Sequence, residues 1–384
     1  MRGTVKKDAP RGSWYFVIDV GPDAATGKRR RLHRRGFETR KSAEAALNSV
    51  LSELRDGDYV EPSSQPVRIY LEHWLAAVAV DRKPSTAAMY AHKMRRYVIP
   101  RIGAMPLRRV DAATLDALYA ELRMSGGRPQ KNGEPGPLAE PTVAAVHRIL
   151  HRAFRDAVRR RIIRSNPAAD ATVPRSNAPR EMKVWTSEEV REFLDSVATD
   201  RLRALWLLAA TTGMRRGELC GLMWKDGNFE ASNVAVRRAR VPIAGKVAEG
   251  TPKSDRARVI AIAPATVSAL RTHRKGQLEE RLAWGEAWQD SGYVFTQADG
   301  SPVRPDAVTR AFEAHVIAAA VPRIRLHDLR HTHATLGLAA GIPAKVMSER
   351  LGHAKVGITL DLYSHVVPGM QEEAAAKLEA LLFG

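Results

Sequence analysis

The sequence predicts a multidomain, mainly helical protein: a small α+β N-terminal domain, an all-α middle domain and a mainly α C-terminal domain with a small β-sheet. A length of 384 residues exceeds that of one ordinary domain. Strand patterns open the chain, whereas helical periodicity dominates residues 66–168. The stretch 169–183 contains prolines and reads as an exposed linker. We therefore expect domains at 1–62, 66–168 and 184–384.

The N-terminal domain is expected to contain two strands followed by a helix. Trp14–Val20 is rich in aromatic and β-branched residues, and Lys28–Arg35 continues as a strongly basic second strand. Ser42–Leu54 carries apolar residues at helical spacing, with Thr39 as a candidate cap. A basic sheet of this kind is either a structural module or a surface for nucleic acid, and we favour the second reading.

The middle domain is expected to be built from helices. The four helical segments are Ile69–Val80, Thr86–Tyr97, Ala112–Leu122 and Thr142–Ile162. Asp111 is a candidate N-cap for the third, and Pro141 stands in the first turn of the fourth, where its missing N–H is harmless.

Positive charge is concentrated in this middle domain. The chain has a formal net charge of +19, and residues 66–178 hold 20 basic and 9 acidic residues. Arg148, Arg152, Arg155 and Arg159 recur at helical spacing, so they share one face, and no acidic row accompanies them. A solvated helix face is the alternative, but we favour contact with phosphates.

Composition excludes several classes of protein. Apolar residues make up 44% of the chain, enough for packed cores. No uncharged stretch approaches the ~20 apolar residues that span a bilayer. Met1–Lys7 lacks the apolar run of a secretory signal, and the single Cys220, expected in the core, excludes an intrachain disulfide. We expect a soluble, cytoplasmic protein that does not bind membranes. Its positive charge indicates a polyanionic partner.

The C-terminal domain carries several short motifs that bear chemistry. Thr211–Leu219 contains a glycine turn that places Arg215 near the start of a helix. Asn233–Val241 and Arg256–Ile262 read as strands, with Lys253 on a hairpin before the second. His327 and Arg330 are three residues apart and therefore share a helix face.

Two further motifs follow. Leu351-Gly352-His353 ends a helix that Pro343 begins, since glycine suits the left-handed closing position. Tyr363 comes ten residues after His353. Taken singly, each of these residues has an ordinary explanation as a surface charge or a core side chain. The histidines His327, His331 and His333 also suggest a metal site, but no glutamate accompanies them in a zinc-hydrolase arrangement.

The order of these motifs resembles the tyrosine recombinase (phage integrase) family. Arg215 stands in a T-G-x-R-x-x-E-L pattern, Lys253 matches the hairpin lysine, His327 and Arg330 match the H-x-L-R-H box, His353 matches the L-G-H box and Tyr363 matches the nucleophile. The resemblance implies an arm-binding domain at 1–62, a core-binding domain of SAM-like fold at 66–168, and the recombinase catalytic fold at 184–384.

The chemistry of the matched residues fits that resemblance. Two guanidinium groups, Arg215 and Arg330, can neutralise the nonbridging oxygens of a phosphodiester as charge grows. Tyr363 is a weak nucleophile at neutral pH and needs a positive field and proton acceptance, for which His327 is the candidate. Lys253 would protonate the departing 5′-oxygen, and His353 would hydrogen-bond a nonbridging oxygen.

The resemblance also implies a product and partners. Attack would yield a 3′-phosphotyrosyl bond that stores the energy for rejoining, so no cofactor or metal is needed. The partners would be double-stranded DNA at core and arm sites, a homotetramer on that DNA, and possible DNA-bending host and excision factors. The segment Gln371–Phe383 either packs on its own domain or docks on a neighbouring protomer; we favour docking.

Alternatives remain for two residues and for the function of the chain. Glu218 either orients Arg215 or is a surface helix charge, and Asp328 either supports His327 or is a helix-start charge. The chain could also be a DNA-binding regulator with this fold and no turnover, which would have no need for Tyr363 and Lys253 together. A metal-dependent nuclease is disfavoured because clustered carboxylates that would hold Mg²⁺ are lacking. The leading expectation is an integrase of a mobile element.

Overall fold

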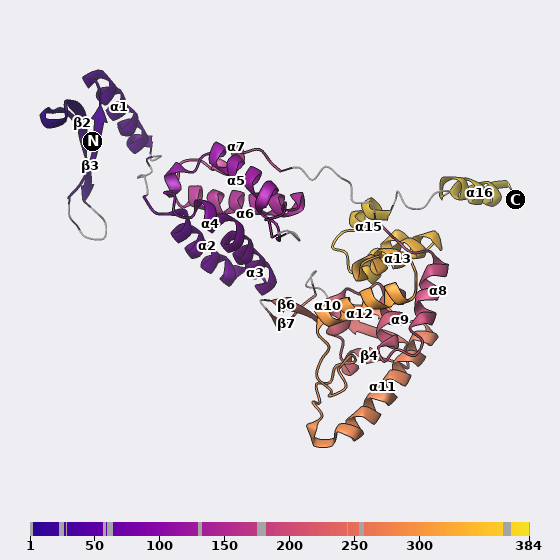
Figure 1. The fold of residues 1–384 in the computed structure, drawn as a ribbon. Coiled ribbons are helices and arrows are strands. Elements are labelled where there is room, and N and C mark those ends of the chain that lie inside the picture. The colour runs from indigo at the N-terminus through magenta and orange to yellow at the C-terminus, as the bar shows by residue number, and fades with distance from the viewer. Residues whose placement is uncertain are drawn as a thin grey trace. The chain divides into compact units, whose positions relative to one another are not determined.

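The computed structural model describes residues 3–383 apart from 23–26, 28, 57–58, 60–63, 130–132, 175–181, 244, 253–256 and 364–369. The chain divides into two compact units, Met1–Ala178 and Pro179–Gly384 (Figure 1). The subdivision of the first unit near residue 62 and the bounds of the linker stay predictions. None of the helices described is long and apolar enough to cross a membrane.

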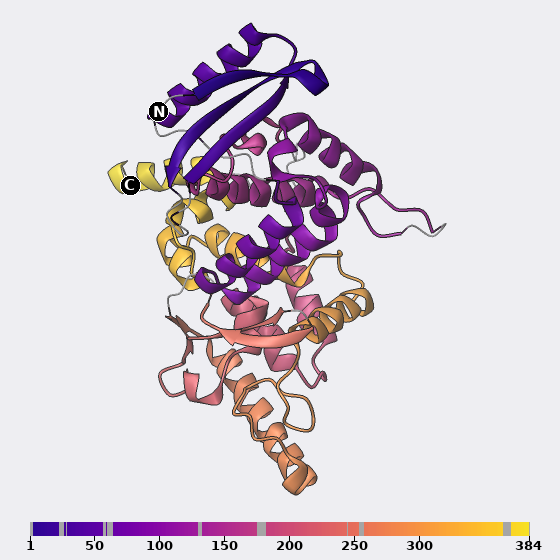
Figure 2. The same ribbon diagram turned by 90° about the vertical axis from the view of Figure 1, so that its left-hand side faces the viewer.

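The first unit begins with a three-stranded antiparallel sheet in the order β1-β2-β3. Its strands are β1 (Gly3–Asp8), β2 (Ser13–Pro22) and β3 (Arg29–Phe37), and α1 (Arg40–Asp56) packs against them. Figure 2 shows α1 lying across the sheet. Phe16, Ile18, Leu47 and Val50 form the small core between sheet and helix, which leaves the basic side chains of β3 largely exposed.

The first strand is absent from the sequence-based expectation. It pairs with β2 from Gly3 opposite Ile18 to Asp8 opposite Ser13. Its sequence, GTVKKD, has one large apolar residue, Val5, so the strand carries almost no alternating pattern. An edge strand is held by main-chain hydrogen bonds to one neighbour. Because such bonds do not depend on side chains, the amino-acid sequence shows little sign of them.

The rest of the first unit is helical, as expected. Its helices are α2 (Val67–Asp81), α3 (Pro84–Lys93), α4 (Ile99–Ile102), α5 (Ala112–Ser125), α6 (Glu140–Arg159) and α7 (Pro167–Asp170). The predicted helix Thr86–Tyr97 is divided, because a π-helical turn follows α3 and leads into α4. Asp111 caps α5 by accepting from the Thr114 N–H at 2.8 Å, and Pro141 lies in the first turn of α6, both as predicted.

The second unit packs helices around two small sheets. Its elements are α8 (Ser187–Ser196), α9 (Arg203–Thr212), α10 (Arg216–Cys220), β4 (Gly227–Asn228), β5 (Asn233–Val236), β6 (Ala239–Ile243), β7 (Lys246–Gly250), β8 (Arg258–Ala261), α11 (Pro264–Trp284), α12 (Pro305–Ala318), α13 (Leu326–Ala339), α14 (Ala344–Leu351), α15 (Val356–Tyr363) and α16 (Met370–Phe383). Strands β4, β5 and β8 form one sheet, and β6 pairs with β7 alone. Trp185, Phe193, Trp206 and Phe312 pack against one another at tilted angles in the main core, and Cys220 is buried there as predicted.

One predicted strand is wrong in extent. The segment Asn233–Val241 forms two strands in different sheets, because the chain leaves β5 at Arg237 and Arg238 before β6 begins. Both arginines pair with the buried Asp226, Arg237 at 3.9 Å and Arg238 at 3.2 Å. The hairpin predicted to carry Lys253 lies outside the described residues.

Helices α13 and α14 approach the turn that ends α9, two residues before Arg215. Helix α9 ends at Gly213, whose φ of 62° closes the helix in the left-handed conformation. A Cβ at Gly213 would lie 2.7 Å from Leu351 Cδ2 and 2.8 Å from His333 Cδ2. Glycine therefore lets α13 and α14 approach the turn that leads to Arg215. Ala334, Met347 and Leu351 pack α13 on α14.

We expect Gly213→Ala to lower the free energy of unfolding more than Gly341→Ala does. Both glycines have positive φ, 62° and 80°, but nothing lies within 4 Å of a Cβ at Gly341. Gly341→Ala should therefore cost only the backbone strain, about 1–2 kcal/mol. Gly213→Ala should add the clash with α13 and α14. Urea denaturation of the full chain measures both; equal losses would show that the close approach at Gly213 is unimportant.

Candidate active site

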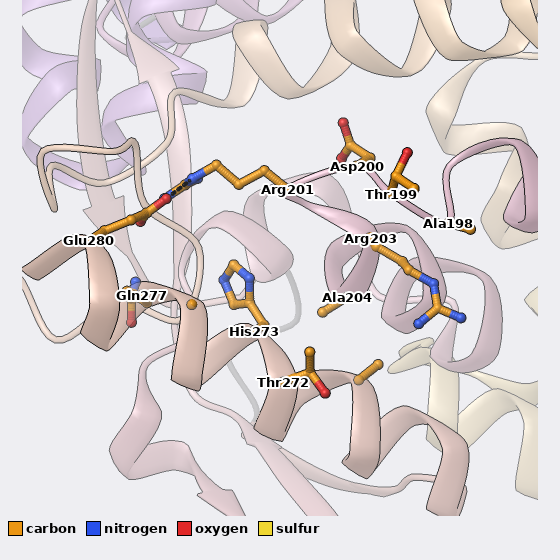
Figure 3. Close-up of a pocket in the computed structure, with 12 residues that line it drawn as sticks. Ala198, Thr199, Asp200, Arg201, Arg203, Ala204, Thr272, His273, Gln277 and Glu280 are labelled. Carbon is orange, nitrogen blue, oxygen red and sulfur yellow. Dashed lines mark hydrogen bonds and ion pairs between the residues drawn. The ribbon is translucent and has the colours of Figure 1, made fainter.

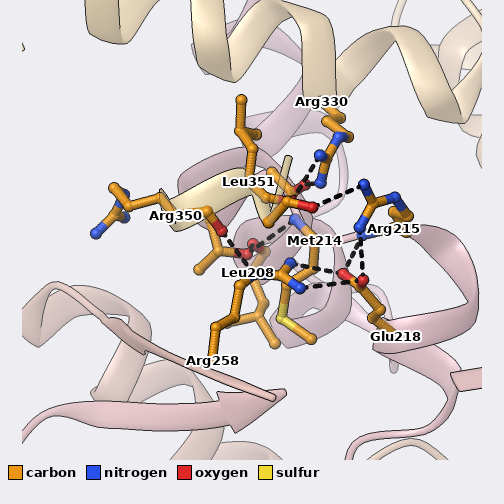
Figure 4. A network of polar contacts seen from close by, with 11 residues as sticks. Leu208, Met214, Arg215, Glu218, Arg258, Arg330, Arg350 and Leu351 are labelled. Carbon is orange, nitrogen blue, oxygen red and sulfur yellow. Dashed lines mark hydrogen bonds and ion pairs between the residues drawn. The ribbon is translucent and has the colours of Figure 1, made fainter. Parts of the chain in front are cut away.

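Two arginines from distant parts of the chain meet at the C-terminal end of α14 (Figure 4). Arg330, on α13, donates to the Leu351 carbonyl at 2.6 Å and to the Gly213 carbonyl at 2.7 Å. Arg215, the residue before α10, donates to the Gly352 carbonyl at 3.3 Å. The last carbonyls of a helix lack partners within it and carry partial negative charge, so they suit guanidinium donors.

Glu218 holds the Arg215 side chain. Its Oε1 accepts from Arg215 Nη1 at 2.9 Å, and its Oε2 accepts from the Arg215 backbone N–H at 2.9 Å. The Glu218 side chain is only 1% exposed. Burial opposes its ionisation, but hydrogen bonds from Arg258 and Arg215 outweigh burial and lower the pKa of Glu218. Of the two readings of Glu218, orientation of Arg215 is the one that the contacts support.

A third arginine, which no sequence motif contains, joins this network. Arg258, the first residue of β8, donates from Nη2 and Nη1 to the two carboxylate oxygens of Glu218 at 2.7 and 3.1 Å. Its Nε donates to the Arg350 carbonyl at 2.8 Å. A single arginine in a strand reads as a surface charge, so the sequence offers no signal for this role.

His353 follows directly after Gly352, which closes α14 with a φ of 66° as predicted. Its Nδ1 lies 2.8 Å from the Thr359 hydroxyl, and its backbone N–H donates to the Ser348 carbonyl. Burial, followed by the cations Arg330 and Arg215, lowers the pKa of His353 to about 4. The His353 imidazole therefore lies close to Arg330 and Arg215, and its lowered pKa favours the neutral form.

His327 lies one turn before Arg330 on α13. Its ring packs edge-on against that of His331, with centroids 5.1 Å apart. Burial, then His331 and Arg330, lowers the pKa of His327 to about 4. Two of the four candidate histidine and arginine positions, His327 and Arg330, therefore come from a single helix turn.

The neighbouring polar residues of α13 have other partners. Asp328 accepts the Arg325 backbone N–H at 2.9 Å and caps the helix, so of its two readings the helix-start charge is the one supported. His333 turns towards α9, with Nδ1 3.0 Å from the Ala210 carbonyl, and is thus separated from the His327–His331 pair. In the described ranges, no three His, Cys, Asp or Glu side chains gather as a metal site requires.

Two of the predicted residues, Lys253 and Tyr363, have side chains outside the described part of the chain. Lys253 lies outside the described residues, between β7 and β8 in sequence. Tyr363 is the last residue of α15, and only its backbone belongs to the described part of the chain. Of the predicted residues, Arg215, Arg330 and His353 lie around the end of α14, and His327 lies one turn before Arg330 on α13.

A separate pocket of the second unit lies away from these residues (Figure 3). A cavity of about 250 Å³ opens between the turn before α9 and helix α11. Arg201 in its wall pairs with Glu280 and donates to the Thr296 carbonyl, and His273 Nε2 lies 2.8 Å from the Val294 carbonyl. These side chains are satisfied by the protein itself, so the pocket has the character of a structural crevice.

The arrangement around α14 suits an anionic substrate. Arg215, Arg258 and Arg330 bring three positive charges, and Glu218 supplies one negative charge, while the neutral histidines add none. A guanidinium has five N–H donors. Among the described residues, the Arg215 side chain uses two of them, to Glu218 and to the Gly352 carbonyl. The remaining donors and the imidazoles can hydrogen-bond oxygens of a phosphate-like group.

Comparison with known proteins gives two matching family models. Residues 183–369 match the phage integrase family, and residues 4–54 match an arm DNA-binding domain. A tyrosine recombinase XerC-like protein of Caldanaerobacter subterraneus subsp. tengcongensis is 29% identical over 394 residues, which is 96% of this chain and 97% of that protein. The ICEBs1 integrase of Bacillus subtilis is 25% identical, over 98% of this chain and 99% of its own.

Solved structures share the fold. The Tn1549 transposon integrase in complex with a circular intermediate DNA has a TM-score of 0.67 and 21% identity, and covers 83% of this chain and 100% of its own. A lambda integrase tetramer bound to a Holliday junction has a TM-score of 0.54 and 18% identity, over 94% of both chains. The expected multidomain, mainly helical architecture with small sheets is thereby confirmed.

We expect the rings of His327 and His353 to be neutral in the free protein at about pH 5.5, well below the usual histidine pKa near 6.5. Nitrogen-detected NMR of the rings measures this, with His327→Asn and His353→Asn to assign the signals. Folded protein then binds fewer protons than the unfolded chain between the usual value and the lowered pKa of about 4. Stability should therefore fall as pH drops through that range. Charged rings at pH 5.5 would contradict the burial described.

Proposed function

Because the chain belongs to the tyrosine recombinase (phage integrase) family, and is a site-specific DNA recombinase, we propose that Arg215, Arg330 and His353 bind the phosphate that is cut. The observation that carries this proposal is the meeting of these side chains at the C-terminal end of α14. Two guanidiniums there can neutralise the nonbridging oxygens as negative charge accumulates in the transition state. Charge compensation of this kind needs no metal ion.

In the proposed reaction the phenolic oxygen of Tyr363 attacks phosphorus, and the bond from phosphorus to the 5′-oxygen breaks. The phenolic proton passes to His327, which is suited to accept it because burial and nearby cations keep its imidazole neutral. Lys253 donates a proton to the departing 5′-oxygen. The product is a 3′-phosphotyrosyl bond and a free 5′-hydroxyl. A 5′-hydroxyl of a second strand reverses these steps, so the bond energy is conserved and rejoining needs no ATP.

The proposal extends to the organisation of the protein on DNA. Residues 1–62 would bind arm sites, residues 66–168 the core site, and 184–384 would perform the chemistry, with 169–183 as the linker. The relatives named above include integrases of mobile elements, which supports integration and excision of such an element in the cytoplasm. A homotetramer on DNA would exchange strands, with DNA-bending and excision factors as further partners.

The C-terminal helix fits an assembly of this kind. In α16, Leu378, Leu381, Leu382 and Phe383 are all more than half exposed. Exposed apolar residues on one helix are typical of a surface that another protein covers. We propose that α16 docks on a neighbouring protomer of the tetramer.

We expect wild-type protein to form an SDS-resistant covalent adduct with a nicked duplex of its core site, and Tyr363→Phe to form none. The phenolic oxygen is the atom that would bond to phosphorus, and phenylalanine lacks it. Gel electrophoresis under denaturing conditions measures the adduct. The core site can be found as a direct repeat, overlapping a tRNA gene in many such elements, beside the coding region. EDTA should leave the yield unchanged.

Three outcomes would contradict this mechanism. They are absence of an adduct with wild-type protein on its true site, an equal yield from Tyr363→Phe, and a strict requirement for a divalent metal. Urea denaturation of the Tyr363→Phe variant serves as the control for folding, so that a missing adduct is assigned to chemistry.

The exposed arginine face of α6 supports DNA binding by the middle domain. Arg148, Arg155 and Arg159 are exposed, while Val143, Val146, Leu150 and Phe154 bury the opposite face. Burial and the nearby Arg148 lower the pKa of Lys93. A phosphate placed between Lys93 and Arg148 would relieve their repulsion, which favours the phosphate-binding reading of this face over a merely solvated one.

We expect the double variant Arg148→Gln and Arg155→Gln to bind core DNA more weakly and with a shallower salt dependence. The slope of log K against log salt should fall by about 0.9 for each phosphate that the variant no longer neutralises. Arg101→Gln is the matched control, because Arg101 already pairs with Glu121 at 2.8 Å. Fluorescence anisotropy across a salt series measures the slopes. A double variant with the wild-type slope would mean that this face does not meet the DNA backbone.

A further inference from the structure

Three consecutive carbonyls at the end of α14 each accept a hydrogen bond from a different arginine. The Arg350 carbonyl accepts from Arg258, the Leu351 carbonyl from Arg330 and the Gly352 carbonyl from Arg215. These arginines come from a strand, a helix and a turn that are far apart in sequence. Arg215 and Arg330 are the residues proposed to bind phosphate, whereas Arg258 belongs to none of the sequence motifs.

Glu218 links Arg258 to Arg215 directly. Its carboxylate receives four hydrogen bonds: two from the Arg258 guanidinium, one from the Arg215 guanidinium and one from the Arg215 backbone. A carboxylate has about four acceptor positions, so this group is saturated. Loss of Arg258 would leave a buried, negatively charged Glu218 with Arg215 as its one remaining cationic partner in the described network, and would draw Arg215 towards it.

Arg258 is itself unsuited to bind substrate. Each of its three guanidinium nitrogens already donates to Glu218 or to the Arg350 carbonyl, and its side chain is only 10% exposed. A Cβ at Gly352 would lie 2.8 Å from Arg258 Nη1, so the guanidinium is packed against the closing turn of α14. Arg258 therefore contacts Glu218 and the end of α14, which in turn hold Arg215 and Arg330.

We propose that Arg258 is a positioning residue for the recombinase reaction: it fixes Glu218 and the end of α14 so that Arg215 and Arg330 present their donors to one phosphate. The inference rests on the proposed function of those two arginines. Arg258 also begins the strand that follows Lys253 by five residues.

The test uses two core-site duplexes that differ only in one substituent of the scissile phosphate. In one the scissile phosphate is natural; in the other a methyl group replaces a nonbridging oxygen, which removes the negative charge. Adduct formation is measured in single turnover with saturating full-length protein. The ratio of the rates on the two duplexes reports how strongly the arginines act on the nonbridging oxygens, and it does not change when some of the protein is unfolded.

We expect Arg258→Ala to slow the reaction on the natural phosphate by about 10- to 100-fold, the effect of a misplaced catalytic group. The methylphosphonate reaction should slow much less, so the ratio falls towards that of Arg215→Ala. Glu218→Gln should lower the ratio in the same way, and the double variant should be no worse than the single ones, because both act through Arg215. Arg258→Lys should recover part of the ratio at most, since a lysine cannot bridge carboxylate and carbonyl in the same geometry.

The matched control is Arg238→Ala. Arg238 pairs with the Asp226 carboxylate at 3.2 Å, and that side chain is 1% exposed, like that of Glu218. Its loss should destabilise the fold but keep the wild-type ratio. If Arg258→Ala does not fold, Arg258→Lys is measured in its place, where a wild-type ratio overturns the inference. An unchanged ratio in Arg258→Ala, with both substrates slowed equally, likewise makes Arg258 a merely structural residue. Failure of wild-type protein to form an adduct would instead refute the proposed function.

Discussion

Like charges repel, and the candidate site must hold several guanidinium groups close together before any anionic substrate arrives. It does so with fixed negative poles: the terminal carbonyls of α14 and the buried carboxylate of Glu218. At short range in a partly dry environment, repulsion between cations is much stronger than in water. The protein therefore uses backbone acceptors and one ionised acid to offset it, and the cations stay in place for the substrate.

The same electrostatic environment governs the histidines. Because burial, and then nearby cationic groups, oppose a further positive charge, the pKa values of His327 and His353 are lowered to about 4. A bound phosphate reverses that balance, since its negative charge stabilises an imidazolium. The proton affinity of these imidazoles would therefore rise when an anionic group is bound.

Much of the architecture and most of the gathered side chains could be predicted from the sequence. Arg215, His327, Arg330 and His353 stand in short motifs with helix caps and glycine turns, which are local signals. The strand β1 and the division of 233–241 could not be predicted, because an edge pairing and an ion-paired bend depend on distant partners. Arg258 was missed for the same reason: its carbonyl and carboxylate partners are 92 and 40 residues away. The roles of Lys253 and Tyr363 stay predictions.

Main-chain oxygens serve as anchors for all three arginines, and this has an evolutionary consequence. A substitution at an exposed position of α14, such as Lys345, Val346 or Glu349, changes a side chain but leaves the anchoring carbonyls where they are. The exposed face of α14, and any protein contacts made there, can therefore change in evolution while the carbonyls still accept hydrogen bonds from the three arginines. Glycine at 352 is the exception, because its left-handed backbone and its crowding by Arg258 leave no space for a methyl group.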